Sequence, residues 1–248
     1  MRLASNVWRY LLLIVVALAC ASVHASGRAS APATAHDGYG HVSPSPDGIG
    51  RTYAGREIAG VMGWQGAAWL ERQEREREER GSRLLRVLAL KPGMNVADIG
   101  AGTGYYERRI APLVGPMGKV YAVDVQPQMV AMLKKIAARP EFVNVVPVLG
   151  AERDPHLAPG SIDLAMMVDV YHELAYPSQM LDAIVRALKP GGRVAFVEYR
   201  AEDPRVPIKS LHKMSEAQVR REAALHALTW QRTDESLPWQ HVVIFVKR

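Results

Sequence analysis

The chain has 248 residues, of which 48% are hydrophobic and 23% charged, and it contains one cysteine. This composition excludes a disordered or collagen-like protein, and a single cysteine cannot form an intrachain disulfide. The formal net charge of +6 points only weakly to phosphates or anionic surfaces. Since no block of Lys and Arg is interleaved with aromatic residues, a nucleic-acid partner is not expected.

The first 25 residues have the three-part pattern of a secretory signal peptide. Arg2 and Arg9 give a positive start, residues 11–19 form an uninterrupted apolar run, and Val23-His24-Ala25 fits a small-x-Ala cleavage site. Because the run is shorter than the roughly 20 residues of a spanning helix, we expect cleavage near Ala25. The sequence thus predicts an exported, periplasmic protein with no stable membrane span. An uncleaved N-terminus that anchors the chain in the membrane is the alternative.

Two segments of different composition follow the predicted signal peptide. Residues 26–52 are rich in Ala, Ser, Gly, Pro and Asp, which predicts a flexible linker. Residues 53–91 predict an N-terminal helical segment. Its charge run places opposite charges four residues apart, as in Glu71 and Arg75, which is typical of a solvated helical face. Ser82 is the predicted cap of a second helix in this segment.

Residues 92–248 predict a single α/β domain in which strands and helices alternate. The predicted strands are 95–99, 119–124, 143–148, 161–169 and 192–199, and the predicted helices are 103–114, 127–138 and 177–188. A helix at 215–227 and strands at 228–234 and 241–247 come last. Alternation predicts a doubly wound, mostly parallel sheet with helices on both faces. The short final connection requires an antiparallel pair, so we expect seven strands with an antiparallel last strand.

One turn in this domain carries the chemistry. Gly100, Gly102 and Gly104 follow a buried strand and precede a helix, where glycines let the backbone approach a ligand closely. Asp124 ends the next strand and can accept hydrogen bonds from both hydroxyls of a ribose, as in an adenine nucleoside cofactor. The Gly-x-Gly-x-Gly spacing differs from the dinucleotide fingerprint and disfavours a nicotinamide-dependent oxidoreductase. Asp98, two residues before the first glycine, suits an ammonium group and not a pyrophosphate.

The stretch from Asp98 to Gly104 resembles motif I of the class I S-adenosylmethionine-dependent methyltransferases, acidic-x-Gly-x-Gly-x-Gly. Residues 121–124 resemble that family's second motif, residues 163–169 its fourth, and residues 188–193 the turn before its fifth strand. The resemblance extends over residues 84–247. It implies a Rossmann-like fold, S-adenosylmethionine as the cofactor, and methyl transfer to a small or medium-sized acceptor through O, N or C.

The resemblance also implies roles for the cofactor-side residues. The three motif I glycines, Gly100, Gly102 and Gly104, would line the methionine and ribose portion, Asp98 would lie near the amino end, and Asp124 would take the ribose hydroxyls. The family's third motif often has Gly-Asp-Ala, whereas this chain has Gly-Ala-Glu-Arg-Asp at residues 150–154. Glu152 and Asp154 therefore both stay candidates for the contact with adenine.

The segment after the fourth strand, residues 169–173, supplies the acceptor-side candidates, because the end of that strand faces the methyl group in this fold. Asp169 is a candidate to orient the acceptor or the cofactor, and Tyr171 to wall the pocket. His172 is a candidate base if the acceptor must lose a proton; its alternative role is to cap the strand end. Much of the rate can come from proximity and orientation. With no His-x-x-x-His or cysteine cluster at ligand spacing, no metal is predicted.

The export signal supports a second hypothesis from another class. S-adenosylmethionine is made in the cytosol, so an exported chain could keep the methyltransferase fold as a non-catalytic module that binds a nucleoside-like ligand. The intact acidic and glycine positions of motif I favour the enzyme.

Overall fold

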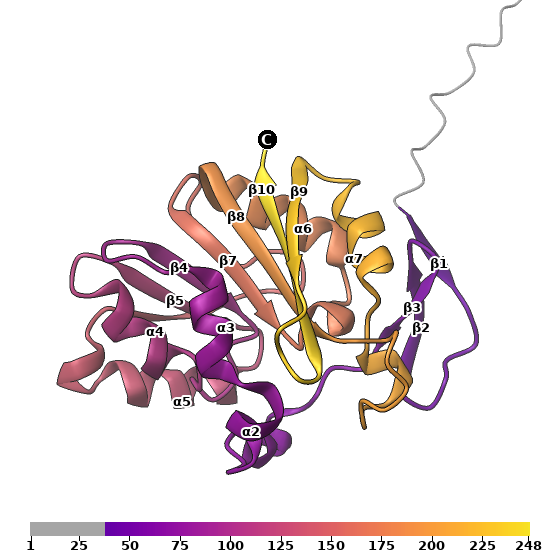
Figure 1. The fold of residues 1–248 in the computed structure, drawn as a ribbon, viewed down its shortest axis with the longest axis horizontal. Helices are drawn as coiled ribbons and strands as arrows, with labels where there is room; N and C mark the ends of the chain where they lie inside the picture. The colour runs from indigo at the N-terminus through magenta and orange to yellow at the C-terminus, as the bar shows by residue number, and fades with distance from the viewer. Residues whose placement is uncertain (1–37) are drawn as a thin grey trace, which may run out of the picture. The chain divides into compact units, whose positions relative to one another are not determined.

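The computed structural model describes residues 38–248, so the predicted signal peptide and residues 26–37 of the predicted linker lie outside the described residues. The main sheet has seven strands in the order β6-β5-β4-β7-β8-β10-β9 (Figure 1). The strands are β4 (Asn95–Ile99), β5 (Lys119–Asp124), β6 (Val145–Leu149), β7 (Ile162–Val168), β8 (Leu188–Tyr199), β9 (Leu228–Asp234) and β10 (Gln240–Lys247). Strand β10 runs antiparallel to both of its neighbours, β8 and β9, and the other neighbouring strands in the main sheet are parallel to each other. The predicted fold class is therefore confirmed.

The sheet carries helices on both faces. Successive side chains of a strand point to opposite faces, and the apolar side chains on both faces are buried. The helices are α3 (Gly81–Leu88), α4 (Glu107–Val114), α5 (Pro127–Ala137), α6 (Pro177–Ala187) and α7 (Glu216–Ala223). Val197 belongs to the hydrophobic cluster that contains Ile110 of α4, whereas the preceding residue, Phe196, belongs to the cluster that contains Met180 of α6 and Val219 of α7. No helix within residues 38–248 is long and apolar enough to cross a membrane.

Strand β4 lies at the centre of the sheet, and its position locates the site. It pairs with β5 on one side and β7 on the other, so the chain order reverses there. The carboxyl ends of these three strands lie at one edge. In open α/β sheets, the crevice outside this edge at the reversal point is where ligands bind.

The N-terminal part of the described chain differs from the prediction. Strands β1 (Tyr39–His41), β2 (Gly48–Tyr53) and β3 (Arg56–Ala59) form a separate antiparallel sheet, here called the N-terminal sheet. Residues 38–52 are therefore no flexible linker, and the segment predicted as helical from residue 53 begins with a strand. The Tyr39 and Tyr53 rings lie 5.0 Å apart, and Ile58 is fully buried. These few large side chains supply the buried surface that the Pro- and Ser-rich composition concealed.

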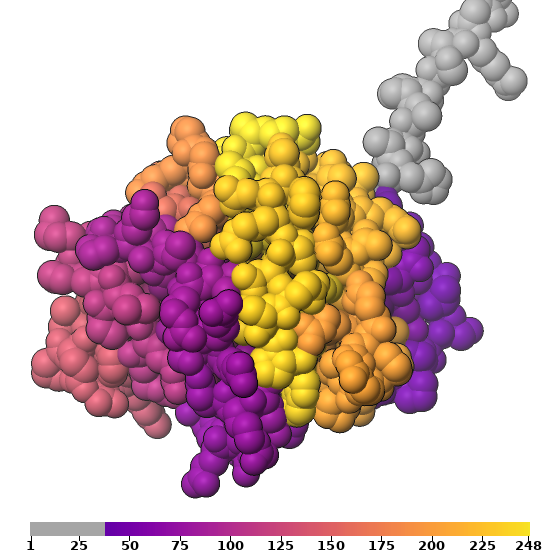
Figure 2. All heavy atoms as spheres, viewed as in Figure 1, coloured from indigo at the N-terminus to yellow at the C-terminus, as the bar shows by residue number. Residues whose placement is uncertain are grey.

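The N-terminal sheet packs against α6 and α7, which cover one face of the main sheet. The Tyr39 hydroxyl donates to Gln179 of α6 at 2.7 Å, and Arg56 forms an ion pair of 2.7 Å with the fully buried Glu222 of α7. In the space-filling view the indigo N-terminal sheet adjoins the orange segment that follows β8 (Figure 2). Two segments that are far apart in the sequence thus cover the same part of the molecule.

The charge run, residues 71–80, is mostly exposed, as its spacing predicts, but two of its residues are buried. The run follows η1 (Trp64–Gly66) and α1 (Ala67–Leu70), and it contains the short helix α2 (Arg75–Glu79). Arg75 is only 5% exposed and Glu79 only 2%. The two residues form the ion pair that their spacing of four predicts, with 2.8 Å between Nε of Arg75 and Oε2 of Glu79. The pair is buried because the Arg75 guanidinium lies over the ring of Tyr105 and the Tyr199 hydroxyl donates to Glu79.

The predicted cap at Ser82 is also wrong. The residue that precedes α3 is Arg80, which has left-handed backbone angles, and the Ser82 hydroxyl instead donates to the Glu76 side chain.

Candidate functional site

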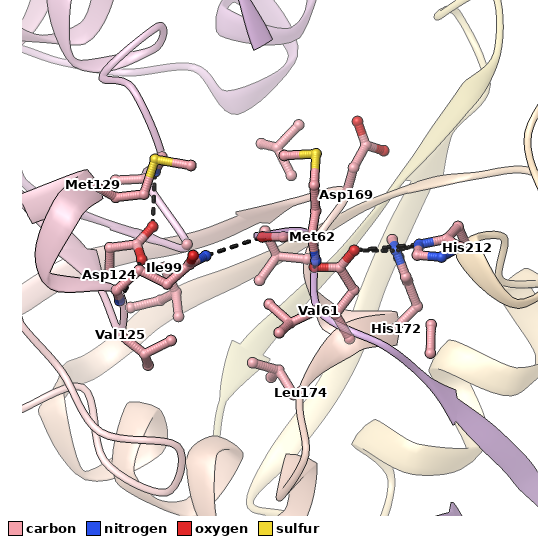
Figure 3. A pocket seen from close by; sticks show the side chains of 18 of the residues that line it. Val61, Met62, Ile99, Asp124, Val125, Met129, Asp169, His172, Leu174 and His212 are labelled. Carbon is pink, nitrogen blue, oxygen red and sulfur yellow. Dashed lines mark hydrogen bonds and ion pairs between the residues drawn. The ribbon is translucent and has the colours of Figure 1, made fainter. Parts of the chain in front are cut away.

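A cavity of about 870 Å³ lies outside the carboxyl ends of β4, β5 and β7. Its walls come from the motif I turn, the N-terminal sheet with the segment after it, and the loop after β8. Figure 3 shows Asp124 and Met129 on one side and His172 and His212 on the other, with Val61 and Met62 between them in this view. We call these the cofactor side and the acceptor side, according to the sequence expectations for their residues.

The motif I turn reaches the cavity through two of its three glycines. Gly100 (φ +79°) and Gly102 (φ +58°) line the cavity, and both have left-handed backbone conformations. A Cβ at Gly100 would lie 2.6 Å from Val170. Gly104 does not line the cavity. A Cβ there would lie 2.3 Å from the Ile136 side chain, so this glycine lets the turn pack against α5. The expectation that Gly104 lines the cofactor is therefore wrong.

Asp124 is held at the cofactor side by the backbone around it. Its Oδ2 accepts from the Gly102 N–H at 3.0 Å and its Oδ1 from the Gln126 N–H at 2.8 Å. Burial raises the pKa of Asp124, and these backbone N–H groups oppose the shift. Each carboxylate oxygen keeps a second lone pair, so the side chain can still accept bonds from two ribose hydroxyls.

Gln126 fixes the segment after the N-terminal sheet to this same edge. Its Nε2 donates to the Met62 carbonyl at 3.0 Å, and its Oε1 accepts from the Trp64 N–H at 2.7 Å. The cavity wall at residues 61–64 is therefore attached to the loop that carries Asp124. Nothing in the local pattern around Gln126 predicted this contact.

Asp98 faces the cavity from β4 and has a second buried carboxyl group, Glu107, beside it. Burial raises the pKa of Asp98 to about 7, and the pKa of Glu107 is raised further above its usual range by burial and by Asp98. Burial thus favours the protonated form of both groups. Asp98 carries the negative charge that pairs with an ammonium group when the pH is above about 7.

The two candidates for the adenine contact separate clearly. Glu152 lines the cavity, whereas Asp154 does not. The Asp154 carboxylate accepts from the His156 N–H at 2.7 Å and lies 3.6 Å from Arg186. Glu152 is therefore the residue of this pair that a cofactor in the cavity could reach.

Asp169 directly follows β7 and has a strained backbone conformation at the acceptor side. Its φ of +55° is in the left-handed region, which is uncommon for a residue other than glycine. Gln240 donates to its Oδ2 at 2.8 Å, and its buried Oδ1 has no hydrogen-bond partner within the described chain. Burial and the Glu79 and Glu198 carboxylates raise the pKa of Asp169 well above its usual range. A buried oxygen without a partner beside a cavity is available to a ligand.

Tyr171 does not wall the pocket. The side chain is fully buried, packs edge to face on Phe196 with 4.8 Å between ring centroids, and does not line the cavity. The expectation that it shapes the acceptor pocket is wrong, because the turn after β7 directs it into the core.

His172 lines the cavity and belongs to a buried network. Its Nδ1 lies 2.6 Å from Glu198 of β8 and its Nε2 lies 3.2 Å from Nδ1 of His212. Burial alone would lower the pKa of His172, but Glu198 and Glu173 outweigh burial and raise it to about 10. The raised pKa favours the protonated imidazole, which donates hydrogen bonds and must lose a proton before it can act as a base.

Several residues that line or support this cavity were not predicted from the sequence. They are Arg75, Glu79, Glu173, Glu198 and His212. Glu198 had a detectable signal, because it is a single acidic residue at the end of the apolar strand 194–197. His212 had none, since its only link to His172 is spatial.

Comparisons with known proteins agree with the fold. A family model described as a methyltransferase domain matches residues 97–194. The arsenite methyltransferase of Halobacterium salinarum is 33% identical over 107 residues, which cover 43% of this chain and 27% of that protein. The protein-L-isoaspartate O-methyltransferase of Methanothrix thermoacetophila is 31% identical over 114 residues, which cover 44% of this chain and 49% of that protein. The chain thus matches half or less of the length of these two relatives.

A solved structure matches more of the chain. It is described as a SAM-dependent methyltransferase from Aquifex aeolicus, is 25% identical and superposes with a TM-score of 0.71. The match covers 76% of this chain and all of that one. Together with the strand order and the motif I turn, these matches show that the chain has the fold of the class I Rossmann-like methyltransferases and contains a methyltransferase domain. The residues at the cofactor side fit S-adenosylmethionine, the cofactor of such neighbours.

Proposed function

We propose that this protein transfers a methyl group from S-adenosylmethionine to a small or medium-sized acceptor bound in the same cavity. One observation carries the proposal: the motif I turn and the end of β7 line a single cavity. Its volume of about 870 Å³ lies in the upper part of the roughly 300–1,000 Å³ range of small-molecule sites. Such a cavity suits two ligands whose reacting atoms must meet.

The charges on the cofactor side support this choice. S-adenosylmethionine has a cationic sulfonium and an ammonium group, and it supplies an electrophilic methyl group. Asp98 is buried beside the motif I turn and is negatively charged above about pH 7. Asp124 has free lone pairs for the ribose, and Glu152 lies where an adenine amine could donate to it. Three carboxylates along one wall favour a cationic nucleoside over a pyrophosphate-linked dinucleotide.

The acceptor side combines an apolar wall with a few polar atoms. Val61, Met62 and Leu174 line it, as do Asp169 and His212. The loop after β8 and the segment after the N-terminal sheet both line this side, and the mixture of apolar and polar groups suits a compact, partly apolar molecule. An oxygen, nitrogen or carbon nucleophile of such a molecule could be oriented by Asp169. Orientation alone can supply much of the acceleration.

We also propose that the protein acts after export. The support is the three-part pattern of residues 1–25, and the cofactor would then have to reach the compartment of the mature chain. Detection of the processed protein in a periplasmic fraction, with the N-terminus after Ala25, is the expected result. A full-length chain in the membrane fraction would favour the uncleaved anchor.

Calorimetric titration with S-adenosylhomocysteine and, separately, with NAD tests the cofactor assignment. Binding of the first alone is the expected result, and binding of NAD alone would contradict the assignment. Turnover of methyl-labelled S-adenosylmethionine with candidate acceptors then separates the enzyme from a binding module. A folded protein that binds S-adenosylhomocysteine but labels no acceptor, in a screen that includes oxygen, nitrogen and carbon nucleophiles, would favour the module.

A further inference from the structure

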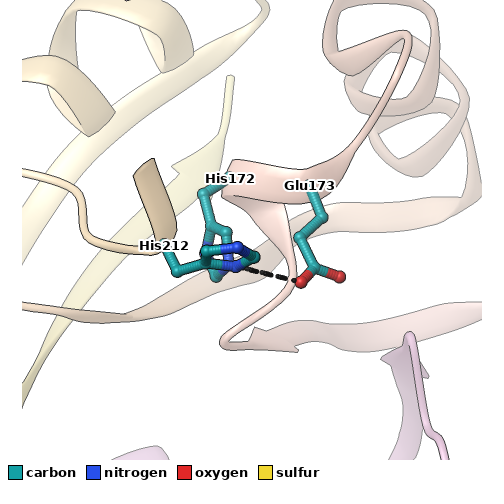
Figure 4. A group of neighbouring side chains, drawn as sticks. All are labelled: His172, Glu173 and His212. Carbon is teal, nitrogen blue, oxygen red and sulfur yellow. Dashed lines mark hydrogen bonds and ion pairs between the residues drawn. The ribbon is translucent and has the colours of Figure 1, made fainter. Parts of the chain in front are cut away.

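We propose that His172, Glu173 and His212 bind a divalent transition-metal ion, zinc being the best match, at the acceptor side of the cavity (Figure 4). Within residues 38–248 they form the single group of three or more His, Cys, Asp or Glu side chains whose potential ligand atoms converge. The ion-binding part of this proposal does not depend on methyl transfer. The role suggested for the ion rests on the proposed function.

The spacing of the three ligand atoms fits one metal ion. Nε2 of His172 lies 3.2 Å from Nδ1 of His212, and that atom lies 3.2 Å from Oε1 of Glu173. The third side of the triangle, between Nε2 of His172 and Oε1 of Glu173, is 3.7 Å. With zinc–ligand bonds of about 2.0–2.1 Å, neighbouring ligands of a tetrahedron are about 3.3 Å apart. The existing triangle therefore needs shifts of only a few tenths of an ångström to hold the ion.

A second layer of contacts orients two of the three ligands. The Nδ1 of His172 donates to the fully buried Glu198, which lies 2.6 Å away, so Nε2 is the nitrogen that faces the other two ligands. An ion that binds there displaces the Nε2 proton, as metal binding to histidine requires. The other Glu198 oxygen accepts from the Tyr171 N–H at 2.9 Å. A carboxylate on the remote nitrogen of a histidine is the common support of metal-bound imidazole.

Glu173 is oriented in a comparable way from the N-terminal side. Its Oε2 accepts from the Met62 N–H at 3.1 Å, so Oε1 is the oxygen that faces the histidines. The ligands come from two short turns, η3 (Tyr171–Glu173) and η4 (Ser210–His212), which contact each other. Both turns are anchored to neighbouring segments, and the site is therefore formed before any ion arrives.

The group is buried on one side and open on the other. The exposed fractions of the side chains rise from 2% for His172 to 12% for Glu173 and 22% for His212, and all three line the cavity. Two histidines and one carboxylate leave a fourth position for water or a substrate atom, as in catalytic zinc sites. Imidazole and carboxylate ligands without a thiolate suit zinc, iron or manganese over copper(I).

Under the proposed function, the open position would bind the acceptor atom. An ion lowers the pKa of a bound hydroxyl or thiol, so the acceptor releases its proton to water and becomes an anion. That anion forms a bond to the methyl carbon while the carbon–sulfur bond of the sulfonium breaks. The cationic cofactor and the anionic acceptor are thereby converted into a neutral thioether and a neutral methylated product.

The test starts with the purified chain, stripped with a chelator and titrated with Zn²⁺ in a calorimeter. One ion per chain is expected. The variants His212→Ala and Glu173→Gln should bind Zn²⁺ at least about tenfold more weakly, given the ten- to hundredfold losses seen even for outer contacts of metal sites. His156→Ala is the matched control, because this exposed histidine bonds to the Leu149 carbonyl and lies outside the cavity.

Cobalt(II) provides an independent measurement on the unaltered protein. Strong visible bands of four-coordinate cobalt, displaced by Zn²⁺, would support the site even if a variant failed to fold. A folded protein that takes up none of Zn²⁺, Co²⁺, Mn²⁺ and Fe²⁺ would overturn the proposal and leave a metal-free hydrogen-bonded cluster. Unchanged Zn²⁺ affinity in both folded ligand variants would overturn it equally.

A parallel titration with S-adenosylhomocysteine separates the two proposals. Cofactor binding without metal binding would refute only the metal site. Metal binding without cofactor binding would refute the proposed methyl transfer while the site itself stood.

Discussion

The Asp124 carboxylate accepts a hydrogen bond from the backbone N–H of Gly102, with 3.0 Å between Oδ2 and the nitrogen. This bond joins the end of β5 to the glycine turn that follows β4. Gly100 and Gly102 of this turn have left-handed conformations and line the cavity without side chains of their own. The carboxylate and the turn are thus positioned relative to each other before a cofactor binds.

Replacement of Asp124 by alanine should weaken S-adenosylhomocysteine binding by about tenfold or more. The variant loses one or two charge-assisted hydrogen bonds to the ribose, each of about 1.5–3 kcal/mol, and about 1.4 kcal/mol corresponds to tenfold. Asp154→Ala is the matched control, since that carboxylate lies outside the cavity. Calorimetric titration of both variants measures the difference, and equal affinities would refute the ribose assignment.

The Asp98 carboxyl should make cofactor affinity depend on pH. Its pKa is raised to about 7 by burial, so the negative charge that pairs with the ammonium group is lost as the pH falls below 7. We expect S-adenosylhomocysteine affinity to decrease between pH 8 and pH 6. Asp98→Asn should bind more weakly at pH 8 and lose most of this dependence. An identical pH profile in the two proteins would contradict the role of Asp98.

Asp98 should also make the free energy of unfolding depend on pH, but in the opposite direction to the cofactor affinity. Since the pKa is higher in the folded than in the unfolded chain, the folded state binds more protons between about pH 4 and pH 7. The contribution of Asp98 to stability is therefore full below about pH 4 and is lost as the pH rises to about 7. Denaturant unfolding across this range should give a flatter profile for Asp98→Asn than for the unaltered chain.

Glu79→Ala should destabilise the fold strongly. The change leaves Arg75 buried without its partner, and removal of one member of a buried ion pair costs about 3–5 kcal/mol. Glu141→Ala provides the comparison, because the pair of Glu141 with Arg139 is exposed and exposed pairs contribute little. Urea unfolding of the two variants tests the contrast. If both variants unfolded at the same urea concentration, the burial of the Arg75–Glu79 pair would be refuted.

Gly104→Ala should cost stability for steric reasons that go beyond its backbone angle. Gly104 and Gly93 have nearly equal φ values, +83° and +85°, so alanine strains the backbone similarly at both. A Cβ at Gly104 would also collide with Ile136, whereas a Cβ at Gly93 meets no atom within 4 Å. We expect Gly104→Ala to be less stable than Gly93→Ala by about 1–3 kcal/mol. Thermal unfolding of the pair gives the comparison.

Much of the main sheet could be predicted because its signals are local. The apolar runs of β4, β5 and β7, the helical patterns between them and the short loop before β10 each lie within a few residues of one another. The glycine turn and Asp124 could be predicted for the same reason. The helix predicted from residue 103 begins only at Glu107, since the turn with its three left-handed glycines extends further than the pattern suggests.

The errors arose where a residue's environment comes from distant parts of the chain. The pairing of Arg75 with Glu79 follows from their spacing, but its burial depends on Tyr105 and Tyr199, which the spacing cannot reveal. The Pro- and Ser-rich segment at 38–52 is ordered because Tyr39 contacts α6.

The sequence by itself therefore determined the class of fold, the cofactor turn and the carboxylate beside it, since hydrophobic periodicity and turn chemistry act over short stretches. Only the tertiary structure decided which charges are buried, that Tyr171 points into the core, and that His212 lies beside His172 across 40 positions of sequence. Burial and metal-ligand geometry depend on distances in space. Those distances are set when segments far apart in the sequence pack together, and the local pattern of one segment carries no information about the other.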